Sequence, residues 1–536
     1  MKLNKIRHLL AASFFAFVAF ARAATIDITT DIAGDVTWTS NNTYVLQTIV
    51  YVRSNAVLSI EPGTVIKGAT NINTLIARDG VPNLVSALWV ARGGRLYATG
   101  TVDHPILFTY EGDDVNSSTD VPYNMSGQWG GVVLCGRATI NSAQFAAGEA
   151  ANPKYERFEG TTTEGQGNAH YFGGDDDEDN SGILRYVSIR YPGNVFAPNR
   201  ELNGLTMAAV GRATTIEYVE VLNSSDDAFE WWGGTVSTRY LVAAFCEDDD
   251  FDTDQGYRGT NQFWFGIKPP WNGSSDSRGF ETDGDLNQTG YPGNNATPHS
   301  SWRVYNATLI GRGTNAAGFG GGVGWNARDE ARPNVYNSIL TDFASGLLID
   351  TDGTNEFSDG VADLRHSILH VGTGLSGATA NAMDFLFDTE RTNTLENPML
   401  GGISYTNNLG LDPRPLPGSP ALRDVLPPAA GLLAVNYRGA FGPNDTWADG
   451  WTALSTTDVL RVASTPAPVL TLGWSGTEIE ISFPTASGAS YQLQSTESLQ
   501  SQTWANEGDP TSGSGSSVSL KRPVGNGARF FRVVTQ

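Results

Sequence analysis

Two stretches decide the fold: YVEVLNSSDDAFEWWGG at residues 218–234 and YLVAAFCEDDDFDTDQG at residues 240–256. Laid over each other without a gap at an offset of 22, they share aromatic, acidic and glycine positions: Tyr218/Tyr240, Asp226/Asp248, Asp227/Asp249, Phe229/Phe251, Glu230/Asp252 and Gly234/Gly256. Degenerate repeats of about 20 to 40 residues in a strand-rich sequence are typical of a β-solenoid. The two stretches are therefore predicted to stack as successive rungs.

Further repeats extend this pattern along the chain. One set is RVYNATL (303–309), NVYNSIL (334–340) and LRHSILH (364–370), and another pairs Tyr51-Val52…Leu58 with Trp89-Val90…Leu96 at an offset of 38. Each rung should supply about three short parallel strands, each stacked about 4.8 Å from its equivalent. Asn, Gly and Asp should lie at the corners, where left-handed or bridge conformations are needed. The insertions at 111–128, 145–181 and 269–298 are predicted to form loops on the flank.

A family resemblance gives the same fold. ALWVARGGRLYATGTVDHPILFT (87–109), VLSIEPGTVIKG (57–68) and LDPRPLPGSPAL (411–422) resemble rungs of secreted bacterial right-handed parallel β-helices of the pectin-lyase-like class. WGGVVLCGRATIN (129–141) and the acidic repeats resemble one widespread family of this class, whose activity is unassigned. The resemblance covers about residues 24–455. It implies an all-β chain whose main domain is a right-handed parallel β-helix, but fold alone does not give function.

The two ends of the chain are predicted to lie outside the solenoid. Residues 1–23 carry a basic start, an apolar run and Ala21-Arg22-Ala23, which together are typical of a secretory signal peptide. Residues 456–467 are predicted to be a linker. Residues 468–536 resemble the small C-terminal β-sandwich, fibronectin-III-like, of many secreted bacterial proteins. No later stretch is long and apolar enough for a membrane span. The protein is therefore expected outside a bacterium or on its surface.

The net charge of the chain limits the kinds of molecule that it is expected to bind. The chain has 34 basic and 57 acidic side chains, a formal net charge of −23. This balance argues against nucleic-acid binding, which needs a basic surface. Its two cysteines, Cys135 and Cys246, are too few for a disulfide framework or a zinc site, and both are predicted to be buried free thiols.

The main chemical signal is an acidic ladder. If Phe229, Phe251 and Phe280 stack inward, alternation along each strand points the first and third following residues outward. The outward residues are Glu230, Trp232, Asp252, Asp254, Glu281 and Asp283. Like charges opposite each other destabilise a sheet. Protonation or a bound hard cation would relieve this repulsion, and Ca²⁺ prefers carboxylate oxygens. The sequence predicts a Ca²⁺ site at Glu230, Asp252, Asp254, Glu281 and Asp283, with a solvated acidic face as the alternative.

Candidate catalytic residues are Asp252, Asp254 and Arg258. Lyases of this fold combine Ca²⁺ with a basic side chain, and Arg258 follows the acidic strand closely. An arginine stays charged in water, so a salt bridge is the competing interpretation. Glycoside hydrolases of the same fold use paired carboxylates. The acidic run at 173–182 lacks the ligand order of an EF-hand and is interpreted as a solvated loop.

Aromatic residues close to the ladder in sequence predict that the ligand is a carbohydrate. The candidate substrate-binding residues are Trp231, Trp232, Trp264 and Trp271. The first hypothesis is a secreted, Ca²⁺-stabilised β-helix that binds extracellular polysaccharide, with cleavage left open between lyase and hydrolase chemistry. The second is a non-catalytic surface or adhesion protein in which the ladder is structural. The residues leave the substrate and the oligomeric state open.

Overall fold

The computed structural model describes residues 24–142, 155–198, 200–271, 277–284, 296–313, 322–350, 354–377, 380–444, 447–461, 470–485, 490–497, 504–513, 516–523 and 529–535. They form two compact units, one up to Pro443 together with Trp447–Val459, the other from Leu460 onward together with residues 444–446. The predicted signal peptide lies outside the described residues. No helix among the described residues is long and apolar enough to cross a membrane.

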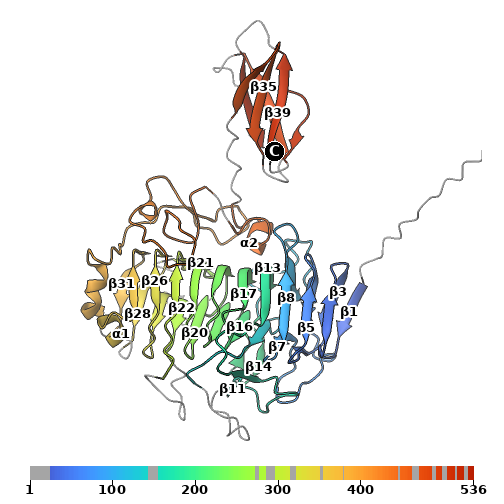
Figure 1. The fold of residues 1–536 in the computed structure, drawn as a ribbon, viewed down its shortest axis with the longest axis vertical. Helices are drawn as coiled ribbons and strands as arrows, with labels where there is room; N and C mark the ends of the chain where they lie inside the picture. Colours follow the sequence, from blue (N-terminus) through green and yellow to red (C-terminus); the bar gives the residue numbers. More distant parts are fainter. Residues whose placement is uncertain are drawn as a thin grey trace, which may run out of the picture. The chain divides into compact units, whose positions relative to one another are not determined.

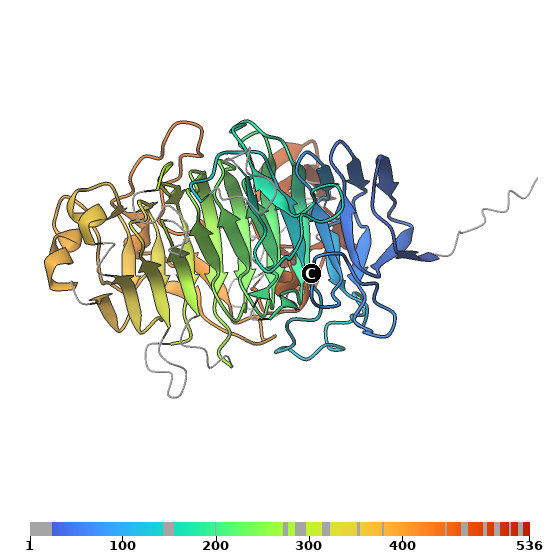
Figure 2. The same cartoon turned by 90° about the horizontal axis from the view of Figure 1, so that it is seen from below.

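One parallel sheet of ten strands forms a face of the first unit (Figure 1, Figure 2). In spatial order its strands are β4 (Ile49–Val52), β7 (Ala87–Val90), β10 (Val132–Cys135), β16 (Leu205–Ala208), β18 (Phe229–Trp232), β20 (Phe251–Asp254), β22 (Arg278–Thr282), β25 (Val323–Ala327), β28 (Ser345–Ile349) and β31 (Thr373–Ser376). The order follows the sequence, with one strand per rung, as a parallel β-helix requires. The predicted fold is confirmed.

The other faces form a parallel sheet of seventeen strands. They are β1 (Ala24–Ile28), β2 (Asp35–Trp38), β3 (Asn42–Leu46), β5 (Val57–Ile60), β6 (Val65–Gly68), β8 (Arg95–Thr99), β9 (Ile106–Tyr110), β13 (Gly182–Arg190), β17 (Thr215–Leu222), β19 (Thr238–Ala244), β21 (Thr260–Ile267), β23 (Arg303–Tyr305), β24 (Thr308–Ile310), β26 (Asn334–Tyr336), β27 (Ile339–Thr341), β29 (Asp363–Arg365) and β30 (Ile368–His370). The predicted repeats are in register, since Tyr305 pairs with Tyr336 and Leu58 with Leu96.

A corner divides this large sheet into two faces. In successive rungs it is made by residues with a positive φ: Tyr186, Tyr218, Tyr240, Phe263, Asn306, Asn337 and His366. Left-handed backbone is unusual for bulky side chains. Here the rings of Tyr186, Tyr218 and Tyr240 stack on one another, with centroids 4.5 and 4.3 Å apart. This stacking offsets the backbone strain of the corner.

The core lies between the sheets. On the ten-stranded sheet, one inward column runs Val50, Leu88, Val132, Leu205, Phe229, Phe251, Phe280, Trp325, Leu347 and Leu375. The predicted alignment of Phe229, Phe251 and Phe280 is confirmed, and all three are fully buried. Cys135 and Cys246 are buried free thiols, as predicted.

Insertions cover the outer surface of the first rungs of the ten-stranded sheet. Two antiparallel hairpins, β11 (Tyr155–Arg157) with β12 (Tyr171–Gly173) and β14 (Val195–Ala197) with β15 (Arg200–Glu201), belong to these insertions. They bring Phe158 and Phe172 onto Trp232, with ring centroids 4.2 and 5.6 Å away. A second apolar cluster therefore forms outside the sheet.

A return segment, residues 420–456, runs back along the corner from the last rungs toward the middle of the solenoid. It begins with the 3-10 helix η3 (Pro420–Leu422) and ends with α2 (Ala453–Thr456). The Asn337 Nδ2 donates to the backbone oxygen of Leu426 at 2.8 Å, and Trp447 and Trp451 pack on Tyr240 and Tyr186. The buried Glu220 carboxylate accepts hydrogen bonds from the first backbone N–H groups of α2.

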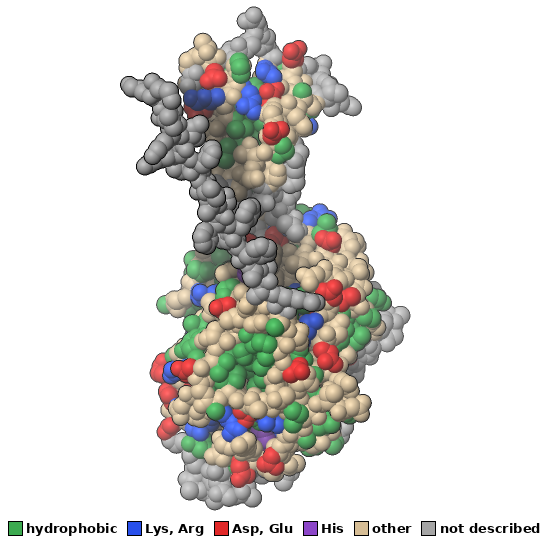
Figure 3. Space-filling model, turned by 90° about the vertical axis from the view of Figure 1, so that its right-hand side faces the viewer, with side chains coloured by type: hydrophobic (Ala, Val, Ile, Leu, Met, Phe, Trp, Pro, Cys, Tyr) green, Lys and Arg blue, Asp and Glu red, His purple; other side chains and the backbone are tan. Residues whose placement is uncertain are grey.

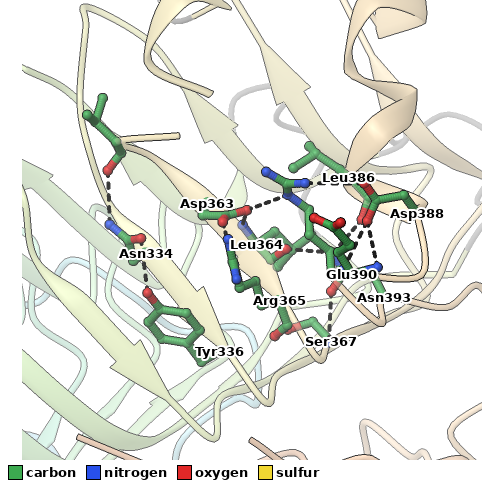
Figure 4. A network of polar contacts seen from close by, with 12 residues as sticks. Asn334, Tyr336, Asp363, Leu364, Arg365, Ser367, Leu386, Asp388, Glu390 and Asn393 are labelled. Atoms are coloured by element: carbon green, nitrogen blue, oxygen red, sulfur yellow. Dashed lines mark hydrogen bonds and ion pairs between the residues drawn. The ribbon is translucent and has the colours of Figure 1, made fainter. Parts of the chain in front are cut away.

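Polar contacts close the C-terminal end of the solenoid, next to α1 (Thr354–Ser358) and the 3-10 helix η2 (Ala380–Phe387). The buried Asp363 carboxylate accepts from Arg365 at 2.5 Å and from Arg391 at 2.9 Å (Figure 4). The Asn393 Nδ2 donates to the backbone oxygens of Leu364 and Leu386. Beyond it, β32 (Leu400–Gly402) pairs with β33 (Asp412–Pro415).

The N-terminal end of the solenoid carries a hydrophobic patch (Figure 3). Figure 3 looks onto this side, where hydrophobic side chains gather with charged residues around them. Ile26 and Val36, in the first two strands, are among the exposed large hydrophobic residues. The stacked rings of Trp38 and Tyr44, 4.8 Å apart, lie behind them in the first rungs.

The second unit contains two small antiparallel sheets. One holds β34 (Thr471–Ser475), β35 (Glu478–Pro484) and β39 (Ser517–Pro523), and the other holds β36 (Ser490–Thr496), β37 (Ala505–Asn506), β38 (Thr511–Ser512) and β40 (Phe530–Thr535). Both contribute to one core of Ile481, Phe483, Tyr491, Leu493 and Val533. Two sheets around one core agree with the expected small sandwich. Its fibronectin-III-like character and the limits of the predicted linker stay predictions.

Candidate functional site

The acidic ladder forms on the outer side of the ten-stranded sheet, as predicted. Glu230 of β18 pairs with Asp252 of β20, and Asp252 pairs with Glu281 of β22. Trp232 pairs with Asp254 in the same two strands. The same outer row carries Tyr51, Trp89 and Val133 in earlier rungs and Asn326 in the next. The row therefore changes from apolar to acidic between β10 and β18.

The ladder is covered rather than solvated. Asp252 and Asp254 are each only 8% exposed, and Glu281 and Asp283 are also buried. The residues around the β11–β12 hairpin lie beside Glu230, Trp232 and Asp254 in one cavity. The alternative of a solvated acidic face is therefore wrong, because the insertion lies over the ends of β18 and β20, and arginines pack on Glu281 and Asp283.

Two arginines neutralise part of the ladder. Arg328 pairs with Asp283 at 2.5 Å and with Glu281 at 3.3 Å. Arg278 pairs with Glu281 at 2.9 Å and with Asp249 at 3.5 Å. Guanidinium groups suit buried carboxylates because their planar N–H donors match the carboxylate geometry. Ion pairing with arginine is thus a third means of relieving the repulsion, beside protonation and a bound cation.

Beneath the ladder lies a fully buried ion pair. The Lys268 Nζ is 3.1 Å from the Asp250 Oδ1, and both side chains are 0% exposed. Lys268 also donates to the backbone oxygen of Asp248. Burial raises the pKa of Asp250 to about 7, although the Lys268 ammonium opposes that rise. Lys268 therefore holds the turn before β20 rather than facing a ligand.

The carboxylates of Asp252 and Asp254 differ from their neighbours. Neither pairs with an arginine or lysine among the described residues, and the Oδ1 atom of each is buried without a hydrogen-bond partner. Burial raises the pKa of Asp252 well above its ordinary value, and the nearby Glu281 and Glu230 carboxylates raise it further. Burial and Asp283 do the same to the pKa of Asp254.

Among the described residues, three groups of carboxylates bring their oxygens within 4.8 Å of one another: Asp226 with Asp227 and Asp248, Asp227 with Glu230 and Asp252, and Asp252 with Glu281 and Asp283. Asp252 belongs to two of them. A buried carboxylate oxygen without a donor is the ligand that a hard cation would satisfy, so these residues fit Ca²⁺. Asp254, which the sequence placed in the metal site, is in none of the three groups and lines the adjoining cavity instead.

The cavity beside the ladder has a volume of about 270 Å³. Its wall combines four carboxylates, two arginines and aromatic rings, namely Glu156, Glu159, Glu230, Asp254, Arg157, Arg200, Phe158, Phe172 and Trp232, with Gly160, Thr161 and Gln255. Arg200 pairs with Glu159 at 2.9 Å, and the Asn203 Nδ2 donates to Glu230. Carboxylates accept hydroxyl hydrogen bonds and arginines donate them, so the cavity suits a polyhydroxylated ligand.

The structure corrects two of the four tryptophan predictions. Trp231 and Trp264 are 0% exposed and stack on each other inside the solenoid, with centroids 5.0 Å apart. They are unavailable to a ligand because both point to the core. Trp232 lines the acidic cavity, and Trp271 lies in a different cavity.

The structure also argues against the prediction that Arg258 is a catalytic base. Its guanidinium pairs with Asp177 at 3.2 Å and donates to the backbone oxygens of Gly256 and Thr139. Arg258 therefore forms a salt bridge, as the competing interpretation expected. Its partner, Asp177, comes from the acidic run at 173–182 and not from the ladder. That run is accordingly tied to the solenoid and is not a freely solvated loop.

The sequence did not point to the residues of the insertion. Glu159 lies in the predicted flank loop 145–181, Arg200 lies outside all the predicted loops, and neither residue belongs to a repeat or motif. The one signal in the sequence of the insertion is a set of acidic and basic residues close to an aromatic residue, as in YERFEG (155–160). The cavity forms only when this insertion folds over β18 and β20.

These features define a parallel β-helix with a covered acidic row and a polar cavity beside it. The chain belongs to the pectate-lyase-like β-helix family: the model described as a pectate-lyase like beta helix domain matches residues 29–398. No curated protein matches the chain.

Two solved structures are similar to the chain at 9% identity. One is the enzymatically active domain of tailspike protein 2 of bacteriophage CBA120, with a TM-score of 0.22, covering 91% of this chain and 69% of that one. The other is full-length tailspike protein 2 of an Escherichia coli O157:H7 bacteriophage, with a TM-score of 0.20, covering 91% of this chain and 61% of that one.

Proposed function

We propose that the protein is a secreted β-helix that binds an extracellular polysaccharide in the acidic cavity and is stabilised by Ca²⁺ at the neighbouring carboxylates. The observation that carries the proposal is Asp252. This side chain is nine-tenths buried, belongs to two carboxylate groups, and has an oxygen that no protein donor satisfies. Leaving such a group buried and unpaired costs several kcal/mol in order of magnitude.

Asp227, Glu230, Asp252, Glu281 and Asp283 would hold the ion. Ca²⁺ would neutralise the part of the ladder that Arg278 and Arg328 leave charged, and it would fix the ends of β18, β20 and β22. Glu230 belongs both to a carboxylate group and to the cavity wall. Binding of the cation and shaping of the cavity are therefore coupled through Glu230.

In the cavity, Arg157 and Arg200 donate to acidic or hydroxyl groups of the polymer, while Glu159 accepts from hydroxyls. Burial and the Asp283 carboxylate raise the pKa of Asp254, and a raised pKa favours the protonated form, which is the form that donates to a glycosidic or carboxylate oxygen. Cleavage would use Asp254 as that acid, with Glu159 or Glu230 as its partner.

A second candidate is a non-catalytic surface or adhesion protein. The observation that favours it is that Glu281 and Asp283 are buried and already paired with arginines, as expected of a structural ladder. In that case the cation would contribute to stability alone.

The cation is tested by thermal unfolding in EDTA and in rising Ca²⁺ or Mg²⁺. At 100 times the dissociation constant, binding to the folded state adds about 2.7 kcal/mol. For about 430 residues this raises Tm by roughly 3 °C. Asp252→Asn should remove the shift, whereas Asp35→Asn, at an exposed position of β2, should keep it. The same shift in Asp252→Asn as in the wild type would exclude the site.

Polysaccharide binding is tested with an array of acidic and neutral polysaccharides. Arg200→Ala and Asp254→Asn should weaken binding, whereas the exposed Asp35→Asn should not. Reducing ends and the absorbance of unsaturated products then distinguish hydrolase from lyase chemistry. Binding without either product would support the non-catalytic role, and no binding to any polysaccharide would refute the proposal.

A further inference from the structure

A second cavity, about 300 Å³ in volume, lies on the first unit at the corner before β20. Its wall contains five aromatic residues, Tyr123, Tyr191, Phe245, Trp271 and Tyr405. They come from distant parts of the chain: an insertion before β10, the ends of β13 and β19, the segment after β21, and the stretch before the return segment. These aromatic residues come together only in the folded solenoid.

The aromatic rings support one another. Trp271 meets Tyr123 edge to face at a centroid distance of 4.9 Å and lies 5.3 Å from Phe245. Tyr123 is nevertheless 68% exposed, although large aromatic side chains are usually buried. Tyr405 is fixed by the hydrogen bond from its hydroxyl to the backbone oxygen of Gly311 at 2.5 Å. The cavity thus has a fixed inner wall and an exposed aromatic edge.

One polar group in the wall lacks a protein partner. Asn223 is more than nine-tenths buried, and its Nδ2 donates to the backbone oxygen of Tyr123 at 3.0 Å. Its Oδ1 accepts no hydrogen bond. A buried amide oxygen without a donor is unfavourable unless a ligand or water supplies one.

The residues that line this cavity cannot bind a ligand through ion pairs. None of the described residues that line this cavity is acidic or basic, whereas the acidic cavity contains four carboxylates and two arginines. Hydroxyl and amide groups of Ser118, Thr119, Asn407 and Thr457 accompany the aromatic rings. Aromatic faces pack against the C–H surfaces of a sugar ring, while these polar groups pair with its hydroxyls.

We infer that this aromatic cavity is a binding subsite for an uncharged sugar unit. The inference rests on the proposed function and extends it: the bound polymer would contain uncharged sugar units in addition to the units held in the acidic cavity. The rung that supplies Phe245 continues into β20, which carries Asp252 and Asp254. One rung therefore contributes to both cavities, and a polysaccharide that contains uncharged units is the substrate class that fits.

The test uses the full chain and isothermal titration with neutral cello-, xylo-, malto- and manno-oligosaccharides of four to six units, in EDTA so that the cation site has no part. At least one series should bind the wild type. Trp271→Ala and Tyr123→Ala should each weaken that binding about tenfold. Trp474→Ala is the matched control, since Trp474 is 75% exposed on the second unit.

Asn223→Gly tests the polar contact without disturbing the backbone. The φ of Asn223 is 52°, which glycine adopts easily, so this variant removes the amide while keeping the turn. It should weaken binding about fivefold or more and lower Tm by only about 1 °C, because the hydrogen bond to the Tyr123 backbone is lost with the amide. Absence of binding by the wild type, or equal losses in Trp474→Ala and Trp271→Ala, would overturn the inference. If Asp254→Asn abolishes polysaccharide binding while Trp271→Ala does not, the proposed function stands and this subsite fails.

Discussion

Replacing Lys268 by methionine is the sharpest test of the electrostatics under the acidic row. Methionine is close to lysine in length and apolar, so it fills the same space without the ammonium group. The change leaves the Asp250 carboxylate buried with its ion-pair partner removed, 3.1 Å from where the Nζ stood. Its other oxygen, Oδ2, already lacks a hydrogen-bond partner.

The expected loss follows from the burial. Removing one partner of a buried ion pair costs about 3 to 5 kcal/mol because an uncompensated charge stays behind. The first unit spans about 430 residues, and its unfolding entropy is roughly 0.9 kcal/mol per kelvin on the usual per-residue scale. Lys268→Met should therefore lower Tm by about 3 to 6 °C at pH 8. The double variant Lys268→Met, Asp250→Asn should recover most of this loss, because no charge remains.

The loss should depend on pH. The pKa of Asp250 in the folded protein is about 7, above the ordinary 3.8, so protonation favours the folded state and this group's contribution to stability falls as pH rises from about 4 to about 7. At pH 5.5 the carboxyl is largely protonated, so the loss in Lys268→Met should be clearly smaller there and come mainly from the hydrogen bond to the Asp248 backbone oxygen. Differential scanning calorimetry at pH 5.5 and pH 8 measures both effects. An equal loss at the two pH values, or no recovery in the double variant, would refute the reasoning.

Three further outcomes are expected. Arg328→Ala removes the partner of Asp283, so melting in EDTA should show a loss of about 1 to 3 kcal/mol, and the Ca²⁺-induced rise in Tm should grow. Glu220→Ala removes the acceptors for the start of α2, so proteolysis within residues 440–456 should accelerate by roughly tenfold or more. Burial raises the thiol pKa of Cys135 and Cys246 to about 12, so neither should react with an aromatic disulfide reagent at pH 8 until denaturant is added.

The stacking of the rungs could be predicted from the sequence because it is a local pattern repeated along the chain. The offset of 22 residues placed Phe229 on Phe251 and Glu230 on Asp252, and the pairing of β18 with β20 is the same. Alternation along a strand then decided which side chains point outward. The same rule puts Trp231 inside, since it stands two residues after Phe229, so its burial follows from the pattern that defined the ladder.

The covering of the ladder could not be predicted in this way. It depends on the insertion around 155–173, which has no period, and on two arginines, Arg278 at the start of β22 and Arg328 in the turn after β25. Arg258 finds Asp177, 81 residues earlier in the chain, so no local spacing relates the two. Trp264 belongs to β21, on another face of the solenoid, and closeness in sequence to the acidic strands did not place it near them in space.

The return segment also decides how the solenoid would respond to mechanical tension. The chain leaves the first unit after α2, whose first N–H groups are bonded to Glu220 in β17. A pull on the C-terminal unit would therefore load the hydrogen bonds from Leu409 and Leu411 to Asp458 and Val459, and then the junction between α2 and β17, before it reached the last rung. The later rungs would be shielded from peeling, and the contacts along the corner would have to shear together. Under such tension the chain would detach as far as α2 first, which would remove Thr457 from the wall of the aromatic cavity but leave the acidic cavity intact.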